Sequence, residues 1–374
     1  MTNELLGTLT PAAFLRRHWQ KKPLLVRGAV PGCGAWLTRG YLFALAARDE
    51  VESRLVRRER GRWRVEHGPI SAARMKRLPA RGWTLLVQGL EQHDREAARL
   101  LKAFSFIPHA RLDDLMVSYA PPGGGVGPHF DSYDVFLLQG AGARRWRISA
   151  QKNLDLVEDA PLRILQDFRH TREWVTRQGD LLYLPPRCAH DGVALTECVT
   201  WSVGFRAPSR RDMLERFLDY LRDQERDDAM YRDPHLKPQA HAAAIHPDML
   251  AQVTRMIGTL RWRKTDIERC LGEYLTEPRA TVTFARPRAM TSAQFAQRLA
   301  RHGARLAPAS RMLTLGRHAF INGETVAVDS AARKILGELA DTRRLAAGLR
   351  IGAPARELLY EWYRAGYLLP GQQD

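Results

Sequence analysis

The sequence predicts an α+β protein in which a β-rich unit is followed by a helical unit and then by a mixed unit. Residues 1–208 contain most of the strand-like apolar runs and most of the glycine and proline residues. Residues 209–275 place apolar residues at helical spacing, and residues 276–374 combine helical patterns with a hairpin signal. A chain of 374 residues is long enough for three domains, and we expect them to have these boundaries.

The strand-like runs of the first unit are short and are bounded by turn residues. Several short strands with turns between them indicate a β-sandwich or a barrel-like sheet. The segment TPAAFLRRHW before them is predicted to be helical, with Thr10 as its N-cap and Pro11 at its first helical position. The expected strands are WTLLVQGL (83–90), DLMVSYA (114–120), YDVFLLQG (133–140), RRWRIS (144–149), DLLYLPP (180–186) and CVTWSVGF (198–205).

The second unit is predicted to be helical because its apolar residues recur at helical spacing. Ser209 is the expected N-cap of SRRDMLERFLDYLRDQE, and the helical pattern continues through 246–275. Such a stripe usually packs inside its own domain, but on a short separate segment it can also form a homodimer interface. We expect a dimer through 209–275. The apolar stripe of the first helix comprises Met213, Leu214, Phe217, Leu218 and Leu221.

The third unit combines three predicted helices with one predicted hairpin. Asn322-Gly323 lies between alternating apolar residues, which is a strong hairpin signal. Helices combined with a hairpin are typical of a winged-helix domain. This unit carries more Lys and Arg than Asp and Glu, which permits contact with nucleic acid without requiring it. The expected helices are MTSAQFAQRLARHG, SAARKILGELA and ARELLYEWYRAGYLL.

The formal net charge of the chain is +17, which favours acidic partners such as nucleic acid or a ribonucleoprotein. Arginines spread over solvated faces would give the same charge. The four cysteines contain no CxxC pair, which argues against a structural zinc site and a dithiol redox site. No apolar run reaches membrane-spanning length, and no signal-peptide pattern is evident. We therefore expect a cytoplasmic protein without membrane contact.

The stretch PHFDSYD (128–134) follows a glycine run and contains His129 and Asp131, separated by one residue. If residues 128–138 form a strand, both side chains point to the same face and could bind one metal ion. The three-letter pattern is common by chance, so taken alone it is better explained as a hydrogen-bonded pair at the end of a strand.

A second stretch, GDLLYLPPRCAHDG (179–192), supplies another histidine, His190, after an apolar strand and a Pro-Pro pair. Two imidazoles and one carboxylate are the facial triad of non-haem Fe(II) oxygenases. This ligand set leaves coordination positions open for a bidentate co-substrate and for dioxygen. A closed structural site would not need open positions.

A co-substrate such as 2-oxoglutarate chelates iron through its keto acid end, so its far carboxylate needs a cation in the pocket. The stretch GAGARRWRIS (140–149) offers Arg144, Arg145 and Arg147, and arginine can bind a carboxylate through two parallel hydrogen bonds. Alternation along a strand places Arg144 on one face and the other two arginines on the opposite face. At least one of these faces must be solvated.

Taken together, these stretches resemble the JmjC-type bacterial ribosomal oxygenases, a branch of the Fe(II)/2-oxoglutarate-dependent cupin superfamily. The resemblance is dense over roughly residues 1–230 and looser beyond them. It implies a double-stranded β-helix core, a helical dimerisation segment and a C-terminal winged-helix-like domain. It also implies hydroxylation of an arginine of ribosomal protein L-sixteen. The resemblance is carried by FLRRHWQKKPLLVRGA (14–29), DDLMVSYAPPGGGVGPHFDSYDVFLLQGAGARRWRIS (113–149), GDLLYLPPRCAHDGVAL (179–195) and SVGFRAPS (202–209).

The resemblance also assigns roles to individual residues. It implies that His129, Asp131 and His190 are the iron ligands and that Arg144 binds the far carboxylate of 2-oxoglutarate. The hydroxyl groups of Ser118 and Ser202 are expected to add hydrogen bonds to the co-substrate, with Thr200 a weaker candidate.

A guanidinium substrate needs an acidic and an aromatic partner, and Asp114 and Tyr133 are our candidates. Asp114 has an alternative role as a turn or cap residue beside Asp113.

Two other functions stay open at this point. The same chemistry could act on another protein residue, such as a histidine or a methylated lysine. Alternatively, the chain could be a non-catalytic basic protein that binds RNA or the ribosome, as its net charge and winged-helix-like tail would allow.

Overall fold

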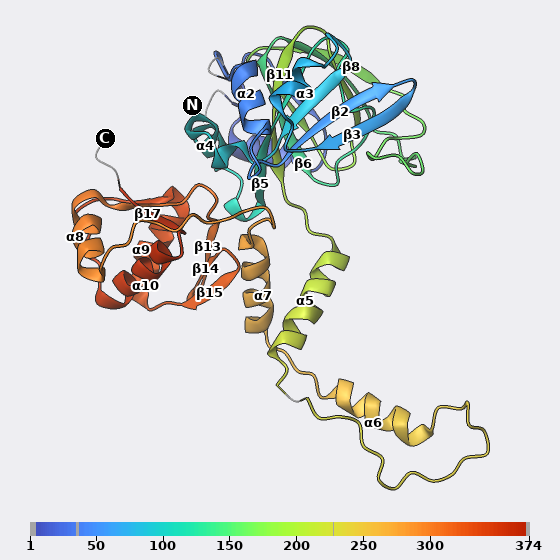
Figure 1. The fold of residues 1–374 in the computed structure, drawn as a ribbon, viewed down its shortest axis with the longest axis vertical. Coiled ribbons are helices and arrows are strands. Elements are labelled where there is room, and N and C mark those ends of the chain that lie inside the picture. Colours follow the sequence, from blue (N-terminus) through green and yellow to red (C-terminus); the bar gives the residue numbers. More distant parts are fainter. Residues whose placement is uncertain (1–4, 35–36, 227, 372–374) are drawn as a thin grey trace.

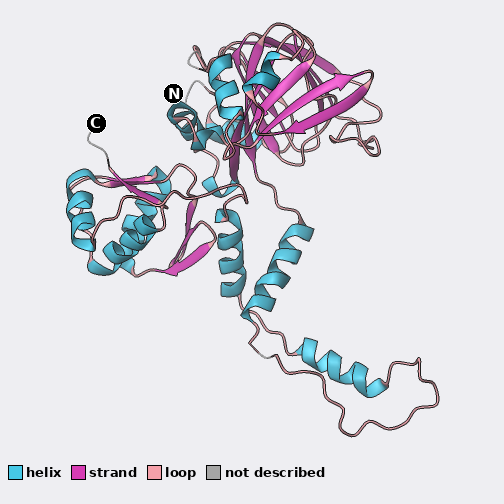
Figure 2. Cartoon of the chain, viewed as in Figure 1, coloured by secondary structure: helices cyan, strands magenta, loops and turns pink. Residues whose placement is uncertain are grey.

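The computed structural model describes residues 5–34, 37–226 and 228–371. A β-rich unit is joined by a pair of helices to a mixed C-terminal unit, and a long arm projects from the helical pair (Figure 1). The two end units contain both helices and strands, whereas the central segment is helical (Figure 2).

In the first unit the helices are α1 (Pro11–Arg17), α2 (Arg39–Ala46), α3 (Ala72–Lys76) and α4 (Arg95–Lys102), with 3-10 turns at Leu90–Gln92 and His109–Arg111. Its strands are β1 (Leu24–Val26), β2 (Ser53–Glu59), β3 (Arg62–His67), β4 (Trp83–Val87), β5 (Leu112–Ala120), β6 (Asp134–Ala141), β7 (Ala143–Ser149), β8 (Arg172–Arg177), β9 (Leu181–Leu184), β10 (Ala189–Ala194) and β11 (Cys198–Phe205).

The central helices are α5 (Arg210–Gln224), α6 (Pro247–Gly258) and α7 (Lys264–Thr276). The C-terminal unit contains α8 (Ser292–His302), β12 (Ala304–Leu306), β13 (Met312–Leu315), β14 (His318–Ile321), β15 (Glu324–Ala327), α9 (Ser330–Thr342), β16 (Arg344–Leu345), α10 (Ala353–Arg364) and β17 (Leu368–Pro370).

Two antiparallel sheets form the first unit. The larger sheet has the order β1-β9-β6-β11-β5-β4-β2-β3, and the smaller has the order β10-β7-β8. Because side chains alternate along a strand, each strand of the large sheet contributes to two layers. On β6, Phe136 packs in the main core with Phe14 of α1 and Leu42 of α2, whereas Leu137 packs with Trp146 of the small sheet. The two sheets therefore face each other, and helices cover the outer face of the large sheet.

Most of the sequence predictions for local structure are confirmed. The six expected strands correspond to β4, β5, β6, β7, β9 and β11, and the side chains of Thr10 and Ser209 cap α1 and α5 as expected. The pattern over 246–275 forms two helices, α6 and α7, with a break at 259–263. The Asn322-Gly323 turn joins β14 to β15, but a further strand, β13, precedes them. Gly316, which has a positive φ of 58°, turns the chain between β13 and β14 and was not recognised as a second turn signal.

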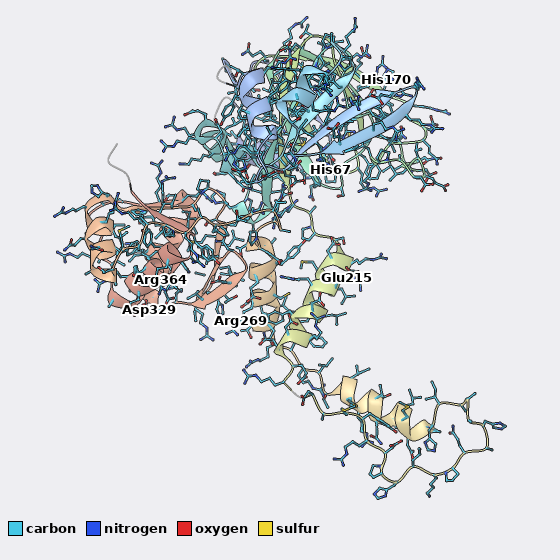
Figure 3. All side chains as sticks on the ribbon, viewed as in Figure 1. His67, His170, Glu215, Arg269, Asp329 and Arg364 are labelled. Atoms are coloured by element: carbon cyan, nitrogen blue, oxygen red, sulfur yellow. The ribbon has the colours of Figure 1, made fainter. Side chains whose placement is uncertain are left out.

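The central helices are sparsely packed. Helix α7 lies between α5 and the strands β13, β14 and β15, whereas α5 and α6 have no buried residue. Figure 3 shows the side chains of α6 standing clear of the rest of the molecule. None of the described helices is both long and apolar enough for a membrane span. The exposed apolar side chains of this segment include Leu214, Leu218, Met249, Leu250, Met256, Ile257 and Trp262.

A carboxylate-rich junction fastens the C-terminal unit to the first unit. Arg279, between α7 and α8, places Nη1 3.2 Å from Oδ2 of Asp114 and 3.7 Å from Oε2 of Glu52. Its Nη2 lies 3.4 Å from Oδ2 of Asp113, and Nη2 of Arg311 lies 3.5 Å from Oδ1 of the same residue. Asp114 is buried, so removing its cation would leave a charge with poor solvation.

We predict that Arg279→Met lowers the free energy of unfolding by about 2 kcal/mol, because Asp114 loses its ion pair inside the protein. Denaturant unfolding of the full chain measures this change. The matched control is Arg286→Met, an exposed arginine of the same segment, which should change stability by less than about 0.5 kcal/mol. Equal effects of the two variants would contradict the role of the junction.

Candidate metal centre

His129 and Asp131 lie in an irregular segment and not on a strand, so the prediction of a strand over 128–138 is wrong in its first half. Strand β6 begins at Asp134, after both residues. The segment is instead fixed by a single bridge to β10. The backbone N–H of His129 donates to the carbonyl of His190 at 2.9 Å, and the N–H of His190 donates to the carbonyl of His129 at 2.8 Å. This long-range pairing brings together two histidines that are far apart in sequence.

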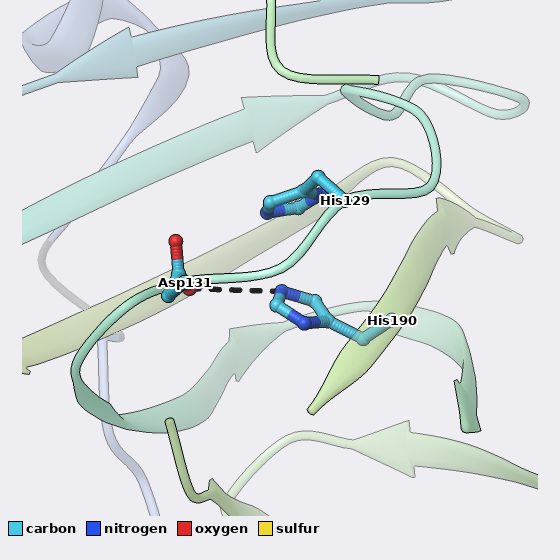
Figure 4. Close-up of side chains that lie close together, drawn as sticks. All are labelled: His129, Asp131 and His190. Atoms are coloured by element: carbon cyan, nitrogen blue, oxygen red, sulfur yellow. Dashed lines mark ion pairs between the residues drawn. The ribbon is translucent and has the colours of Figure 1, made fainter. Parts of the chain in front are cut away.

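The predicted metal ligands converge. His129, Asp131 and His190 each offer one ligand atom, and these atoms lie within 4.8 Å of one another. Oδ2 of Asp131 is 3.8 Å from Nε2 of His190, and the side chains meet from two separate segments (Figure 4). His190 is buried, whereas the other two are half-buried. One carboxylate and two imidazoles therefore offer ligand atoms to a common space.

Hydrogen bonds orient both imidazoles for metal binding. Nδ1 of His129 is 2.9 Å from the carbonyl of Gly127, and Nδ1 of His190 is 2.9 Å from the carbonyl of Cys188. A carbonyl only accepts, so each Nδ1 carries the proton and each Nε2 keeps a free lone pair. Burial, and secondly the charge of His129, lowers the pKa of His190 to about 4. His190 is therefore neutral near pH 7, as a metal ligand must be.

The glycines before His129 allow close packing at the rim. At Gly127, which has a positive φ of 81°, a Cβ would lie 2.5 Å from the ring of Trp63. At Gly125 it would lie 2.7 Å from the carbonyl of Gly192 on β10. Side chains at these positions would displace the segment that carries His129. Trp63 of β3 was missed in the sequence, because only the β2–β3 pairing brings it to this rim.

Arg144 is a buried cation on the inner face of β7. Its Nη1 donates to the carbonyl of Gly192 at 3.2 Å, Nη2 lies 3.5 Å from Oγ of Ser118, and Nε has no hydrogen-bond partner. No carboxylate of the described residues lies within ion-pair distance of it. A buried guanidinium without a counter-ion is unfavourable unless an anion occupies the site. The arrangement thus fits a carboxylate ligand between the sheets.

The alternation predicted for β7 is confirmed. Arg145 and Arg147 lie on the outer face, where Nε of Arg147 is 2.8 Å and Nε of Arg145 is 4.0 Å from Oε2 of Glu173. Both are partly exposed. They form the solvated edge that the sequence required for one of the two faces.

The three predicted hydroxyl side chains lie on the inner face of the large sheet. Thr200 is opposite Ser118 in the β11–β5 register, and Ser202 is two residues further along the same strand. The hydroxyl of Ser118 lies beside Arg144 and donates to the carbonyl of Thr200 at 3.4 Å. Thr200 donates its hydroxyl to Gln139 at 3.2 Å, so it is occupied within the protein. The hydroxyls of Ser118 and Thr200 thus both have partners within the protein, and that of Ser118 lies beside the Arg144 guanidinium.

Asp114 and Tyr133 flank one position on the inner face. A Cβ at Gly204 would lie 3.5 Å from the Tyr133 ring and 3.7 Å from Oδ1 of Asp114. The structure gives Oδ2 of Asp114 internal partners, Arg279 and the N–H of Gly89 at 3.3 Å, which sequence reasoning missed. Oδ1 and the Tyr133 ring both lie near Gly204, and the pKa of Tyr133 is raised first by the charge of Asp131 and then by burial. A carboxylate and an aromatic ring therefore lie together beside Gly204.

Comparisons with known families agree with this geometry. Residues 99–213 match the JmjC domain, and residues 259–369 match the ROXA-like winged helix. The ribosomal protein uL16 3-hydroxylase of Escherichia coli is 34% identical over 345 residues, which is 91% of each chain. A probable ribosomal oxygenase of Haemophilus influenzae is 40% identical over 55% of this chain and 52% of its own length.

Solved structures give the same result. The chain matches the X-ray structure of E. coli YcfD with a TM-score of 0.83 and 31% identity, over 97% of this chain and 98% of that one. YcfD, a ribosomal oxygenase, in complex with cobalt and 2-oxoglutarate matches with a TM-score of 0.81 and 32% identity, over the same shares. The predicted JmjC core and winged-helix-like C-terminal domain are confirmed. The chain belongs to the JmjC-type ribosomal oxygenases.

Proposed function

We propose that this chain is an Fe(II)- and 2-oxoglutarate-dependent oxygenase that hydroxylates an arginine side chain of ribosomal protein uL16, the L-sixteen protein of the large subunit. The observation that carries this proposal is the facial triad of His129, Asp131 and His190 together with Arg144, a buried cation that no carboxylate of the described residues pairs with. The relative named a uL16 3-hydroxylase supports the substrate.

Each residue of the site has a task in this reaction. His129, Asp131 and His190 would hold Fe(II), and Arg144 would bind the far carboxylate of 2-oxoglutarate, with Ser118 and Ser202 adding hydrogen bonds. Bound iron, together with 2-oxoglutarate and dioxygen, supplies the oxidising power to hydroxylate an unactivated C–H bond. The protein holds the target carbon in place and keeps the buried inner face shielded from bulk water.

The substrate arginine is proposed to bind beside Gly204, near Asp114 and Tyr133. Oδ1 of Asp114 would accept hydrogen bonds from its guanidinium, and the Tyr133 ring would stack on it. The enzyme is strongly basic, so its overall field does not attract a basic ribosomal protein. The attraction must come from local carboxylates, and Arg279 leaves one oxygen of Asp114 available for this purpose.

The decisive test is anaerobic loading with Fe(II), followed by oxygen, 2-oxoglutarate and a uL16 peptide, read by mass spectrometry. We expect the mass of an added oxygen on arginine, and Asp131→Ala should abolish it. Asp341→Ala, which removes an exposed carboxylate on α9 of the C-terminal unit, should retain it. Succinate without peptide modification would mean another target, such as histidine or methyl-lysine. Absence of both products with wild-type protein would favour a non-catalytic RNA- or ribosome-binding protein.

We predict that Asp114→Asn raises KM for the arginine peptide by about tenfold or more, because a charged hydrogen bond to the guanidinium is lost. Arg279→Met is the matched comparison, since both variants break the same ion pair at the junction. Steady-state kinetics of the two variants separates substrate binding from loosening of the junction. Equal effects of both variants on KM would show that Asp114 has no direct role in substrate binding.

We also propose a homodimer through residues 209–275, supported by exposed apolar side chains on α5 and α6. Light scattering at micromolar concentrations should give twice the monomer mass of 42.5 kDa. Introducing charge with Leu250→Glu and Ile257→Glu on α6 should yield monomers, whereas Ala251→Glu, at an exposed position on the other face of the same helix, should not. A monomeric wild-type protein would refute the dimer.

Two further parts of the proposal concern the surroundings of the enzyme. A ribosomal protein as substrate supports a cytoplasmic location for the enzyme. The net charge of +17 supports contact with ribosomal RNA. The domain boundaries at 208 and 275 remain part of the proposal.

A further inference from the structure

The first and third units meet at a second place, where positive charges face each other. Lys102 of α4 belongs to the first unit, and Arg305 of β12 and Arg344 of β16 belong to the third. We call these three residues the cationic seam. Figure 1 shows α4 next to the part of the C-terminal unit that contains β17. Strand β12 lies between β16 and β17 in the same sheet.

Two members of the cationic seam are paired directly across adjacent strands. Arg305 is opposite Arg344 in the antiparallel register of β12 and β16. Side chains in such a pair point to the same face, and like charges there destabilise the sheet. The fold retains this arrangement although a neutral residue at either position would remove the repulsion.

The positive charges of the cationic seam lower one another's pKa values. The pKa of Lys102 is lowered first by burial and then by the charges of Arg344 and Arg343. The pKa of Arg305 is lowered by burial and then by Arg95 and Arg344. Cations from α4 and from the β12–β16 edge therefore lie close enough to repel across the boundary of the two units.

The described residues place no carboxylate within ion-pair distance of Lys102, Arg305 or Arg344. The nearby Glu96 of α4 is already paired with Arg99, at 2.5 Å. The carboxylate-rich junction differs in this respect, because Arg279 faces Asp113 and Asp114 there. The same two units thus meet through matched charges at one place and through unmatched positive charges at the other.

We infer that the cationic seam is a binding surface for the phosphate backbone of RNA. Its cations come from three elements in two units, so an extended polyanion can contact them all, whereas an isolated small anion would contact a part of them. Phosphates would relieve the repulsion between Arg305 and Arg344. This inference goes beyond the proposed hydroxylation and stands even if the target residue proves to be different.

The test measures binding of a short fluorescein-labelled RNA stem-loop to the full chain by fluorescence anisotropy over a series of salt concentrations. The seam variant combines Lys102→Gln, Arg305→Gln and Arg344→Gln. We expect it to bind at least about tenfold more weakly than wild type and to show a salt slope reduced by roughly two to three, since about 0.7 to 0.9 is lost with each phosphate contact.

The control variant removes the same charge elsewhere, with Lys152→Gln, Arg172→Gln and Arg177→Gln. These exposed residues lie at or near β8 in the small sheet, on the opposite side of the large sheet from α4. The control should keep most of the RNA affinity. Equal losses in both variants would show that net charge, and not the seam, binds RNA. No measurable binding by the wild-type chain would overturn the inference outright.

A second readout guards against misfolding. Removing unmatched like charges should leave the melting temperature of the seam variant unchanged or higher, whereas RNA should raise the melting temperature of the wild type alone. Hydroxylation of the free uL16 peptide by the seam variant should equal that of wild type. A lower melting temperature without RNA would show that the seam is structural, and the inference would fail.

Discussion

The paired backbone hydrogen bonds between His129 and His190 are the interaction on which the site depends. They hold the irregular segment that carries His129 and Asp131 against β10. Ligands that are far apart in sequence therefore face one space. Carbonyls of Gly127 and Cys188 then fix the imidazole tautomers, which leaves Nε2 of each ring free to bind metal. The glycines before His129 are needed because side chains there would meet Trp63 and β10.

The half-buried Arg279 and the buried Arg144 show how this fold accommodates positive charge. Arg279 is matched by Asp113 and Asp114 and joins the units, whereas Arg144 has no anionic partner among the residues that the structure describes. A buried charge without a partner destabilises the unliganded protein, and a bound carboxylate compensates it. A site for an anionic co-substrate can therefore contain a buried cation that destabilises the unliganded protein. In the cationic seam, Arg305 and Arg344 are likewise neighbouring positive charges that a bound anion would compensate.

Much of the site could be predicted from local sequence. Alternation along β7 placed Arg144 inside and Arg147 outside, because a period of two is a property of any strand. The pairing with β10 could not be predicted, since register between distant strands depends on the whole sheet, and the strand was therefore extended wrongly over His129. The partner of Asp114 was missed for a similar reason, because Arg279 reaches it only when two units pack together.

The central claim is that the triad and Arg144 form one site for Fe(II) and 2-oxoglutarate. The most direct measurement is an anaerobic calorimetric titration of 2-oxoglutarate into Fe(II)-loaded wild-type protein and the Arg144→Met variant, with iron content measured for both. The account predicts that the iron content of the two proteins is equal. It also predicts that the variant binds 2-oxoglutarate at least about a hundredfold more weakly, because a buried charge pair is lost. Unchanged affinity in the variant would contradict the account.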